Sequence, residues 1–301
     1  MAAILSPPSN FLRMPMDLQN KVAVITGSTR GFGRALARAL LARGATVVIS
    51  GRQQETVDAT VAQLTPQGTV AGIACDVSVE AQVHALAAAT LSRFGRIDIW
   101  VNNAGITAPP GGVLDFPPAT AEHIWRVNAL GTLLGTQVAV AVMKRQPEGG
   151  TIVNLYGRGS NGRPGSPTGL YAASKAWITS FTRTLAQEYH HLPIRFIGFS
   201  PGMMTTDMLR VREVVGEQAA ARLRNLPRVL AALATSPEVP AKALVRLLER
   251  NHKPFVEYRS LRGFRLLKGL VYMAWLNLRG APTLPRDQLT IEPPYEPPLS
   301  R

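Results

Sequence analysis

The sequence predicts an α/β fold in which helices cover both faces of a doubly wound parallel sheet. Short apolar runs alternate with helical patterns along most of the 301 residues, and neither a repeat nor a low-complexity linker divides the chain. Strands that are apolar throughout, each followed by a helix, are typical of parallel sheets buried on both sides. Hydrophobic residues make up 46% of the chain and charged residues 17%, which excludes a disordered protein. We therefore expect a single large domain.

The first strand is expected at Val22–Ile25, and the spacing of Phe32, Leu36 and Leu40 predicts a helix directly after it. Further strands are predicted by short runs that alternate with alanine- and leucine-rich helical segments: Thr46–Ser50, Val70–Ala74, Ile97–Val101, Ile152–Leu155 and Ile194–Phe199. The predicted boundaries are residues 1–20 for an N-terminal extension, 21–258 for the folded domain and 259–301 for a basic and apolar C-terminal tail.

Charge and cysteine content narrow the classes of function. The net charge of +14 predicts attraction to an anionic ligand or surface. The single cysteine, Cys75, excludes an internal disulfide framework and a cysteine-based zinc site, and the histidines show no metal-ligand spacing. No stretch of about 18 residues is both apolar and uncharged, and the N-terminus lacks the pattern of a signal peptide. We expect a cytoplasmic protein without a membrane-spanning helix or a metal.

A glycine-rich turn follows the first predicted strand, where residues 26–33 read Thr-Gly-Ser-Thr-Arg-Gly-Phe-Gly. The first glycine allows a tight turn, and the other two let the backbone approach a pyrophosphate at a helix N-terminus. An ordinary glycine turn is the alternative interpretation. The cofactor-binding residues predicted here are Gly27, Ser28, Arg30, Gly31, Phe32 and Gly33.

The end of the second predicted strand indicates which nicotinamide cofactor is bound. An acid at this position holds the ribose 2′-hydroxyl of NAD, whereas arginine accommodates the 2′-phosphate of NADP. The residues after Ile49 are Ser-Gly-Arg, with Arg52 and no acid, and Arg30 in the glycine turn adds a second cation. The sequence therefore predicts NADP(H), against the alternative of two solvated surface arginines.

Tyr171 and Lys175 are expected to form the catalytic pair. They stand four residues apart on a predicted helix, which places both side chains on one face. A free phenol titrates near 10, too high for acid–base catalysis at neutral pH, and a neighbouring ammonium lowers that value. We expect Tyr171 to exchange a proton with the substrate. We expect Lys175 to lower the pKa of Tyr171 and to bind the ribose of the cofactor.

In combination, these motifs resemble the short-chain dehydrogenase/reductase family. The resemblance rests on the GxxxGxG spacing, the Tyr-x-x-x-Lys pair and Asn102-Asn103-Ala104-Gly105 after the fourth predicted strand, and it covers residues 21–255. It implies a Rossmann-type sheet of about seven strands, and homodimers or homotetramers. It also implies that Asp76 and Val77 meet the adenine and that Asn103, Ala104 and Gly105 line the cofactor cleft.

The resemblance assigns roles at two more places. Asn128 matches the helix asparagine that holds a water in the proton path to the lysine, with a buried structural asparagine as the alternative. Residues 200–206, Ser-Pro-Gly-Met-Met-Thr-Thr, match the loop after the sixth strand, so that Pro201, Gly202 and Thr205 are expected at the nicotinamide carboxamide.

One departure from the family pattern concerns the substrate. Gly157 occupies the place of the serine that usually bonds the substrate carbonyl, and Ser160 is our candidate for the missing donor. The stretch 157–164, Gly-Arg-Gly-Ser-Asn-Gly-Arg-Pro, resembles the corresponding loop of the chlorophyll(ide) b reductase-like branch, which reduces a formyl group. If no donor replaces the serine, the alternative is a catalytically degenerate NADP-binding sensor or scaffold.

The expected function is hydride transfer between NADP(H) and a small apolar aldehyde, ketone or alcohol, with a chlorophyll-type formyl group as one candidate. Methionines in residues 203–235 favour an apolar substrate, although a helix core would look the same. From Arg250 to Arg279 the chain carries seven Lys or Arg and one acid, Glu257. This tail fits either peripheral contact with an anionic membrane or docking on a neighbouring subunit. No nucleic-acid motif accompanies the charge, so no nucleic-acid partner is expected.

Overall fold

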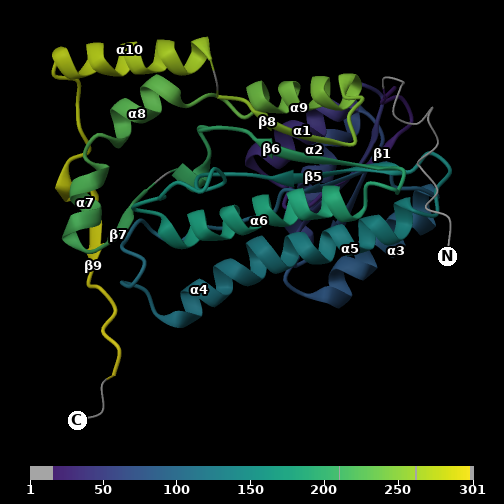
Figure 1. Ribbon diagram of the computed structural model, residues 1–301, viewed down its shortest axis with the longest axis horizontal. Helices are drawn as coiled ribbons and strands as arrows, with labels where there is room; N and C mark the ends of the chain where they lie inside the picture. Colours follow the sequence, from purple (N-terminus) through teal and green to yellow (C-terminus); the bar gives the residue numbers. More distant parts are fainter. Residues whose placement is uncertain (1–15, 210, 262, 299–301) are drawn as a thin grey trace.

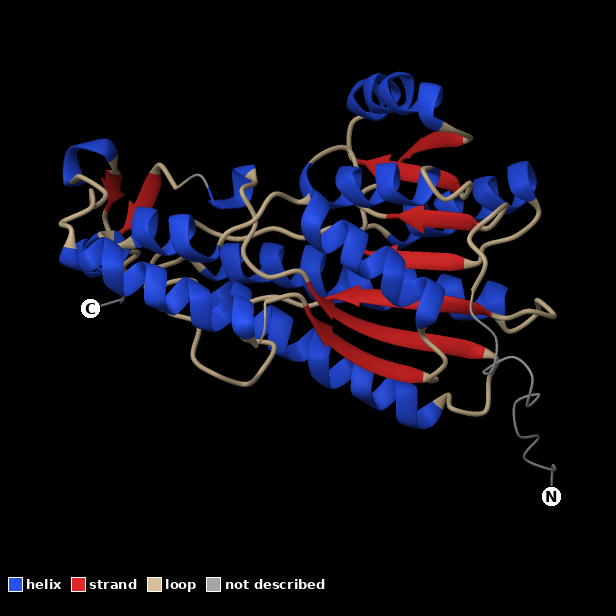
Figure 2. Ribbon diagram, turned by 90° about the horizontal axis from the view of Figure 1, so that it is seen from above, coloured by secondary structure: helices blue, strands red, loops and turns tan. Residues whose placement is uncertain are grey.

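A seven-stranded parallel sheet forms the centre of the computed structural model, which describes residues 16–209, 211–261 and 263–298. The strand order is β3-β2-β1-β4-β5-β6-β8, which is the doubly wound arrangement that the sequence predicts (Figures 1 and 2). The strands are β1 (Val22–Ile25), β2 (Thr46–Gly51), β3 (Val70–Ala74), β4 (Ile99–Asn102), β5 (Gly150–Leu155), β6 (Ile194–Ser200) and β8 (Phe255–Arg259).

Two helical layers bury the two faces of this sheet. One layer contains α1 (Gly31–Leu41), α2 (Gln54–Leu64) and α9 (Glu238–Arg250), and the other contains α3 (Glu80–Phe94), α5 (Gly131–Met143) and α6 (Gly169–Glu188). Neighbouring residues of one strand pack against opposite helical layers, because successive side chains point to opposite faces of the sheet. Ile25 and Val101 pack with the first layer, while Val24 and Trp100 pack with the second. Both sets are buried, which explains the uninterrupted apolar runs in the sequence.

A long helix crosses the second layer. It begins as α4 (Pro118–Trp125), passes through a π-helical turn, η2 (Arg126–Leu130), and continues as α5. This segment, Pro118–Met143, has the length and apolar composition of a membrane-crossing helix, and 56% of its apolar window is buried inside the fold. Burial of this kind is found in the central helix of many folded domains, so the composition by itself carries no conclusion about a membrane.

The C-terminal segment joins residues 213–233 in a lobe beyond the carboxyl ends of the strands (Figure 2). The lobe contains β7 (Glu213–Val215), α7 (Glu217–Leu223) and α8 (Leu226–Leu233). In the C-terminal segment, β9 (Thr290–Glu292) pairs with β7, and α10 (Phe264–Leu278) packs against α8. The predicted tail thus contributes a strand and a helix, and most of the predicted N-terminal extension, residues 1–15, lies outside the described residues.

Candidate active site

The glycine turn lies between β1 and α1, against the segment that follows β4. Gly27 has a φ of +61°, and a Cβ atom on it would stand 2.8 Å from the Cα of Ala104. A Cβ on Gly33 would stand 2.6 Å from Nδ2 of Asn103. Neither glycine can therefore carry a side chain, and the glycine turn packs directly against Asn103 and Ala104.

Thr26 and Asn103 hold this junction together. The Thr26 hydroxyl accepts hydrogen bonds from the amides of Asn103 and Ala104, both at 3.0 Å. In return, the Asn103 side-chain amide donates to the carbonyls of Thr26 (2.8 Å) and Gly27 (2.9 Å). Asn103 thus fixes the glycine turn to the segment after β4. The sequence analysis missed Thr26, although its place as the first residue of the turn was a usable signal.

The turn leaves the N-terminus of α1 open to an anion. No side chain caps this helix, so its first amides remain directed outward with the positive end of the helix dipole. The Phe32 ring points into the core, where it stacks on Phe199 with 5.9 Å between ring centroids. The Ser28 hydroxyl is buried and ties β1 to β2, donating to the Ile25 carbonyl and accepting from the Ser50 amide. A cofactor contact by Ser28 stays a prediction.

The two arginines expected at the adenosine ribose are both exposed. Arg52 directly follows β2, and no acid lies within that strand. Arg30 pairs with Asp207 of the loop after β6, at 3.6 Å between Nη1 and Oδ2. Because both partners of this pair are solvated, the pair is weak, and Arg30 can turn toward an anion at the glycine turn.

Asp76 and Val77 follow β3, next to Arg52. Burial raises the pKa of the Asp76 carboxyl, but hydrogen bonds from the hydroxyl and amide of Ser78 and the nearby charge of Arg52 bring it below its ordinary value. Both Ser78 bonds end on Oδ1 of Asp76, at 2.7 and 2.9 Å. Val77 is buried against the long helix, where a Cβ on Gly131 would stand 2.7 Å from it. The adenine contacts themselves stay predictions.

Tyr171 and Lys175 lie together on α6, beside the carboxyl end of β5. Lys175 is only 4% exposed, and its ammonium donates to the Leu155 carbonyl at 2.9 Å while lying 5.7 Å from the centroid of the Tyr171 ring. Burial lowers the pKa of Lys175 to about 8 and raises the pKa of Tyr171 to about 12. We expected the ammonium to lower the phenol pKa. In this structure burial dominates, because the ammonium faces the ring and the β5 carbonyl.

Asn128 lies in the π-helical turn η2 and is completely buried. Its side-chain oxygen accepts from the Ile106 amide at 2.8 Å, and its side-chain nitrogen donates to the Ile106 carbonyl and to the Ser174 hydroxyl, both at 2.9 Å. Ser174 donates in turn to the Tyr171 carbonyl at 2.7 Å. Asn128 therefore fixes α6 to the segment after β4, and its predicted water-holding role stays a prediction. The sequence analysis missed Ser174, although it stands within the Tyr-x-x-x-Lys motif.

The loop after β5 shows why glycine occupies position 157. A Cβ on Gly157 would stand 2.4 Å from the Tyr171 hydroxyl, so the phenol lies directly over this backbone. Ser160 is buried, and its hydroxyl accepts from the Gly157 amide at 2.9 Å and donates to the Lys175 carbonyl at 3.3 Å. Ser160 is thus close to α6 but already bonded to the backbone. Its role as carbonyl donor stays a prediction that requires the bond to the Lys175 carbonyl to open, because a hydroxyl has only one hydrogen to donate.

The loop after β6 crosses the mouth of the glycine turn. Pro201 is buried and Gly202 has a φ of +82°. Thr205 is exposed and donates its amide to the Thr235 carbonyl at 3.0 Å. The adjacent Thr206 lies over the turn, because a Cβ on Gly31 would meet its methyl group at 3.5 Å. The sequence has two consecutive threonines here, and the pattern does not tell which of them lies over the glycine turn.

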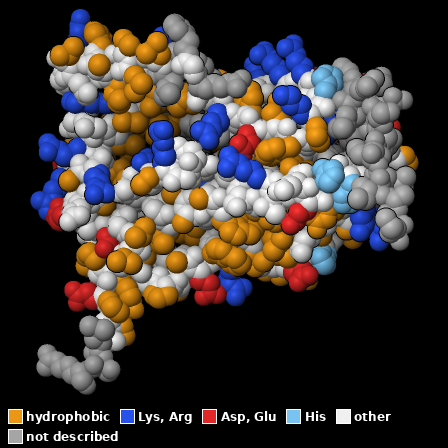
Figure 3. Space-filling view, in the orientation of Figure 1, with side chains coloured by type: hydrophobic (Ala, Val, Ile, Leu, Met, Phe, Trp, Pro, Cys, Tyr) orange, Lys and Arg blue, Asp and Glu red, His pale blue; other side chains and the backbone are white. Residues whose placement is uncertain are grey.

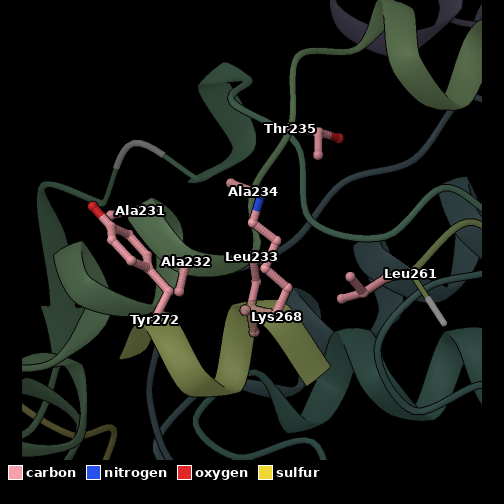
Figure 4. A pocket seen from close by; sticks show the side chains of 9 residues that line it. Ala231, Ala232, Leu233, Ala234, Thr235, Leu261, Lys268 and Tyr272 are labelled. Carbon is pink, nitrogen blue, oxygen red and sulfur yellow. The ribbon is translucent and has the colours of Figure 1, made fainter. Parts of the chain in front are cut away.

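Two hollows adjoin this region. The larger, of about 410 Å³, lies between α8 and α10 and is lined mostly by apolar groups (Figure 4): Ala231, Ala232, Leu233, Ala234, Thr235, Leu261, Lys268, Gly269 and Tyr272. The smaller, of about 10 Å³, is lined by Thr107–Pro109, Phe116 and Pro167–Tyr171. The smaller one therefore borders Tyr171. The larger one meets the loop after β6 only at Thr235, so it does not directly adjoin the place where the nicotinamide is predicted to bind.

A family profile described as short chain dehydrogenase matches residues 21–214. The chain belongs to the short-chain dehydrogenase family. Members are oxidoreductases with a nicotinamide-dinucleotide fold, and the residues present fit such a cofactor. The α1 N-terminus is open, and the space over Gly105 is bounded by Asn128 Oδ1 and Lys175 Nζ, which a Cβ at that glycine would approach to 3.3 and 3.7 Å.

Relatives within the short-chain dehydrogenase family carry different names. The chain is 32% identical over 259 residues to a probable chloroplastic chlorophyll(ide) b reductase of Arabidopsis thaliana, covering 71% of this chain and 52% of the relative. It is 35% identical over 212 residues to a levodione reductase of Leifsonia aquatica, covering 69% and 76%. The chain spans about half the length of the plant relatives it matches.

A solved structure confirms the fold. It is a 3-ketoacyl-(acyl-carrier-protein) reductase from Brucella melitensis complexed with NADH, with a TM-score of 0.69 and 28% identity over 81% of this chain and 98% of that one. The predicted resemblance to the short-chain family and its chlorophyll(ide) b reductase-like branch is therefore confirmed, as is the predicted sheet.

Proposed function

We propose that this protein is an NADP(H)-dependent oxidoreductase that interconverts an apolar aldehyde or ketone and the corresponding alcohol. The observation that carries the proposal is that the half-buried Tyr171 and the buried Lys175 lie side by side, between the glycine turn and the loop after β5. A phenol and an ammonium in this setting can exchange a proton at a substrate oxygen and hold a ribose, which matches the chemistry of the family.

Each side chain has a defined task in this reaction. The bound dinucleotide supplies or accepts the hydride. Tyr171 donates a proton to the carbonyl oxygen in reduction. Burial raises its pKa to about 12, so the phenol carries its proton at neutral pH but is a weaker acid than a free tyrosine. The Lys175 ammonium has three N–H donors, of which the Leu155 carbonyl takes one, so two remain for the ribose hydroxyls. Asn128 and Ser174 hold α6 in register with the cofactor cleft.

The choice of NADP(H) over NAD(H) rests on charge. Arg52 directly follows β2 and Arg30 lies in the glycine turn, and β2 contributes no acid that would repel a 2′-phosphate. Arginine suits a phosphate because its planar fork can form two charge-assisted hydrogen bonds. The solved neighbour holds NADH, so similarity does not decide between the two cofactors.

The substrate class follows from the surroundings of the site. The small hollow beside Tyr171 is lined by more apolar than polar groups, and so is the larger one between α8 and α10, which meets the loop after β6 at Thr235. The relatives' names span a chlorophyll(ide) and levodione at similar identity, so we propose an apolar carbonyl and include a chlorophyll-type formyl group as one candidate. We also propose that the protein is a homo-oligomer. On α4 and α6, Trp177 stacks on Phe181 and meets the 46% exposed Trp125 edge-on, and this aromatic cluster would suit such an interface.

Turnover of the full chain with NADPH or NADH and a panel of apolar aldehydes and ketones tests the proposal. We expect loss of NADPH absorbance with at least one carbonyl, and slower loss with NADH. A cofactor-binding sensor or scaffold would bind NADPH and consume none with any member of the panel. Faster turnover with NADH would contradict the cofactor assignment and leave the catalytic assignment standing.

A further inference from the structure

Helix α10 is apolar on two opposite sides. Its inner side packs against α8, where a Cβ on Gly269 would stand 2.3 Å from a Leu233 methyl group. Met273 and Leu276, at helical spacing from Gly269, are half-buried on the same side. The outer side presents Leu267, Leu270, Val271 and Leu278, which are 59%, 46%, 64% and 88% exposed. Exposed apolar side chains gathered on one side of a surface helix mark an interaction site, so the outer side of α10 calls for a partner.

The contacts of α10 fix which side faces outward. Arg228 of α8 donates to the side-chain oxygen of Asn277 and to the Ala281 carbonyl, both at 2.9 Å, and so holds the C-terminal end of the helix. Leu267, Val271, Ala274 and Leu278 follow one another at intervals of four, three and four residues and therefore form one continuous stripe. Figure 3 shows hydrophobic side chains gathered along α10, with Lys and Arg side chains beside them.

The part of the sequence that contains the stripe carries charges of one sign only. From Tyr258 to Pro285 the sequence contains five Lys or Arg and no Asp or Glu. Lys268 is exposed within α10, and the Arg279 guanidinium lies 4.7 Å from the centroid of the Trp275 ring at its end. Trp275 and Tyr272 stack on each other and are 44% and 42% exposed. Aromatic rings of this amphipathic kind favour the boundary between lipid and water.

We infer that α10 docks this protein onto an anionic lipid surface. The outer stripe enters the boundary between headgroups and acyl chains, while Lys268 and Arg279 face acidic headgroups. The helix lies on the surface rather than crossing it, because 15 residues extend only about 22 Å, short of the roughly 30 Å hydrocarbon core. The net charge of +14 draws the molecule toward the same surface.

Co-sedimentation of the full chain with vesicles tests this inference. The vesicles contain phosphatidylcholine alone or phosphatidylcholine with roughly a third phosphatidylglycerol, at about 0.1 M and about 1 M salt. The wild type should sediment with the acidic vesicles at low salt and much less with neutral ones or at high salt. The double variant Leu267→Gln/Leu278→Gln should bind at least about 10-fold more weakly, because two apolar side chains no longer leave water. Glutamine preserves the helix.

Two matched variants serve as controls. Leu114→Gln changes an 84% exposed leucine in the loop before α4 and should bind as the wild type does. Lys268→Glu changes the charge by two and should weaken binding to acidic vesicles by about 25-fold, at roughly 5-fold per charge, whereas Lys144→Glu at the end of α5 should change it little. Thermal unfolding followed by circular dichroism checks that each variant folds, independently of any catalytic activity.

Four results would overturn the inference. The wild type could remain in the supernatant with acidic vesicles, or the folded double variant could sediment as well as the wild type. Equal binding of the wild type to neutral and acidic vesicles would contradict the preference for an anionic surface. Light scattering without lipid supplies the fourth result: if the wild type is twice the mass of the double variant, the stripe is covered by a second copy of the chain and not by lipid.

Discussion

Placing the family's usual serine at position 157 should reduce activity rather than improve it. A Cβ at Gly157 would stand 2.4 Å from the Tyr171 hydroxyl and 3.1 Å from Cζ of the same ring. Ordinary contacts begin at 3.4 Å, so the phenol oxygen would have to move by about 1 Å. A misplacement of that size at a reacting group costs on the order of 100-fold in rate. We therefore expect Gly157→Ser to lower kcat about 100-fold.

The assay compares turnover and cofactor binding in a small set of variants. Gly157→Ala should lose as much as Gly157→Ser, because the clash comes from Cβ and not from the hydroxyl. NADPH binding, measured by calorimetry, should be nearly unchanged, since the glycine turn is untouched. Gly162→Ser is the matched control in the same loop, where nothing lies within 4 Å of the added Cβ. Its φ of +75° brings backbone strain of about 1 kcal/mol without contact to Tyr171. Wild-type or higher turnover in Gly157→Ser would refute the position of the phenol.

Three further predictions concern the cofactor, the loop and pH. Arg52→Ala should weaken NADPH roughly 10-fold in calorimetric titration and leave NADH nearly unchanged, with Arg145→Ala as control; equal weakening of both cofactors would contradict a phosphate contact. Ser160→Ala should lower turnover by roughly 10-fold or more, and a fall in kcat at unchanged KM would favour a carbonyl donor over loop support. The kcat/KM for reduction should stay level below about pH 8 and fall above it. Burial lowers the pKa of Lys175 to about 8, so its ammonium is lost as the pH rises through that value. Tyr171, with a pKa raised to about 12, keeps its proton over the same range. A kcat/KM that rises above pH 8 would contradict the conclusion that Lys175 titrates before Tyr171.

The structure also changes how the cofactor preference should be reversed. An acid at the end of β2 would repel a 2′-phosphate, and Gly51 is the natural position to introduce it. However, a Cβ at Gly51 would stand 2.8 Å from the methyl group of Thr29. Gly51→Asp therefore requires Thr29 to rotate, and the pair Gly51→Asp/Thr29→Ser is the better test of a switch toward NADH.

The sheet could be predicted from the sequence because each strand is marked by its own residues. Val22–Ile25 and Val70–Ala74 were expected with the bounds that the structure shows, and the glycine turn was placed correctly between strand and helix. These signals are local, since burial on both faces makes a strand apolar throughout. The placement of Tyr171 and Lys175 on one face follows equally from a four-residue spacing on one helix.

Features that depend on distant residues could not be predicted in this way. The pairing of β9 with β7 joins Thr290 to Glu213, and neither short strand has a distinctive pattern. Thr206 faces the glycine turn through the course of a loop, which two consecutive threonines do not reveal. The raised pKa of Tyr171 depends on how many groups bury it and on where the neighbouring ammonium points. Each of these features depends on the tertiary structure and leaves no periodic pattern in the sequence.

Removal of the Tyr171 hydroxyl tests the central claim most directly. Tyr171→Phe keeps the ring and its contact with Lys175 but deletes the group that exchanges the proton. The measurement is NADPH consumption with the best carbonyl of the panel, alongside calorimetric binding of NADPH, with Tyr189→Phe at an exposed tyrosine of α6's end as control. We predict that Tyr171→Phe loses at least about 100-fold in kcat and binds NADPH nearly as the wild type does, whereas Tyr189→Phe is unchanged. Retention of most of the wild-type turnover by Tyr171→Phe would contradict the account.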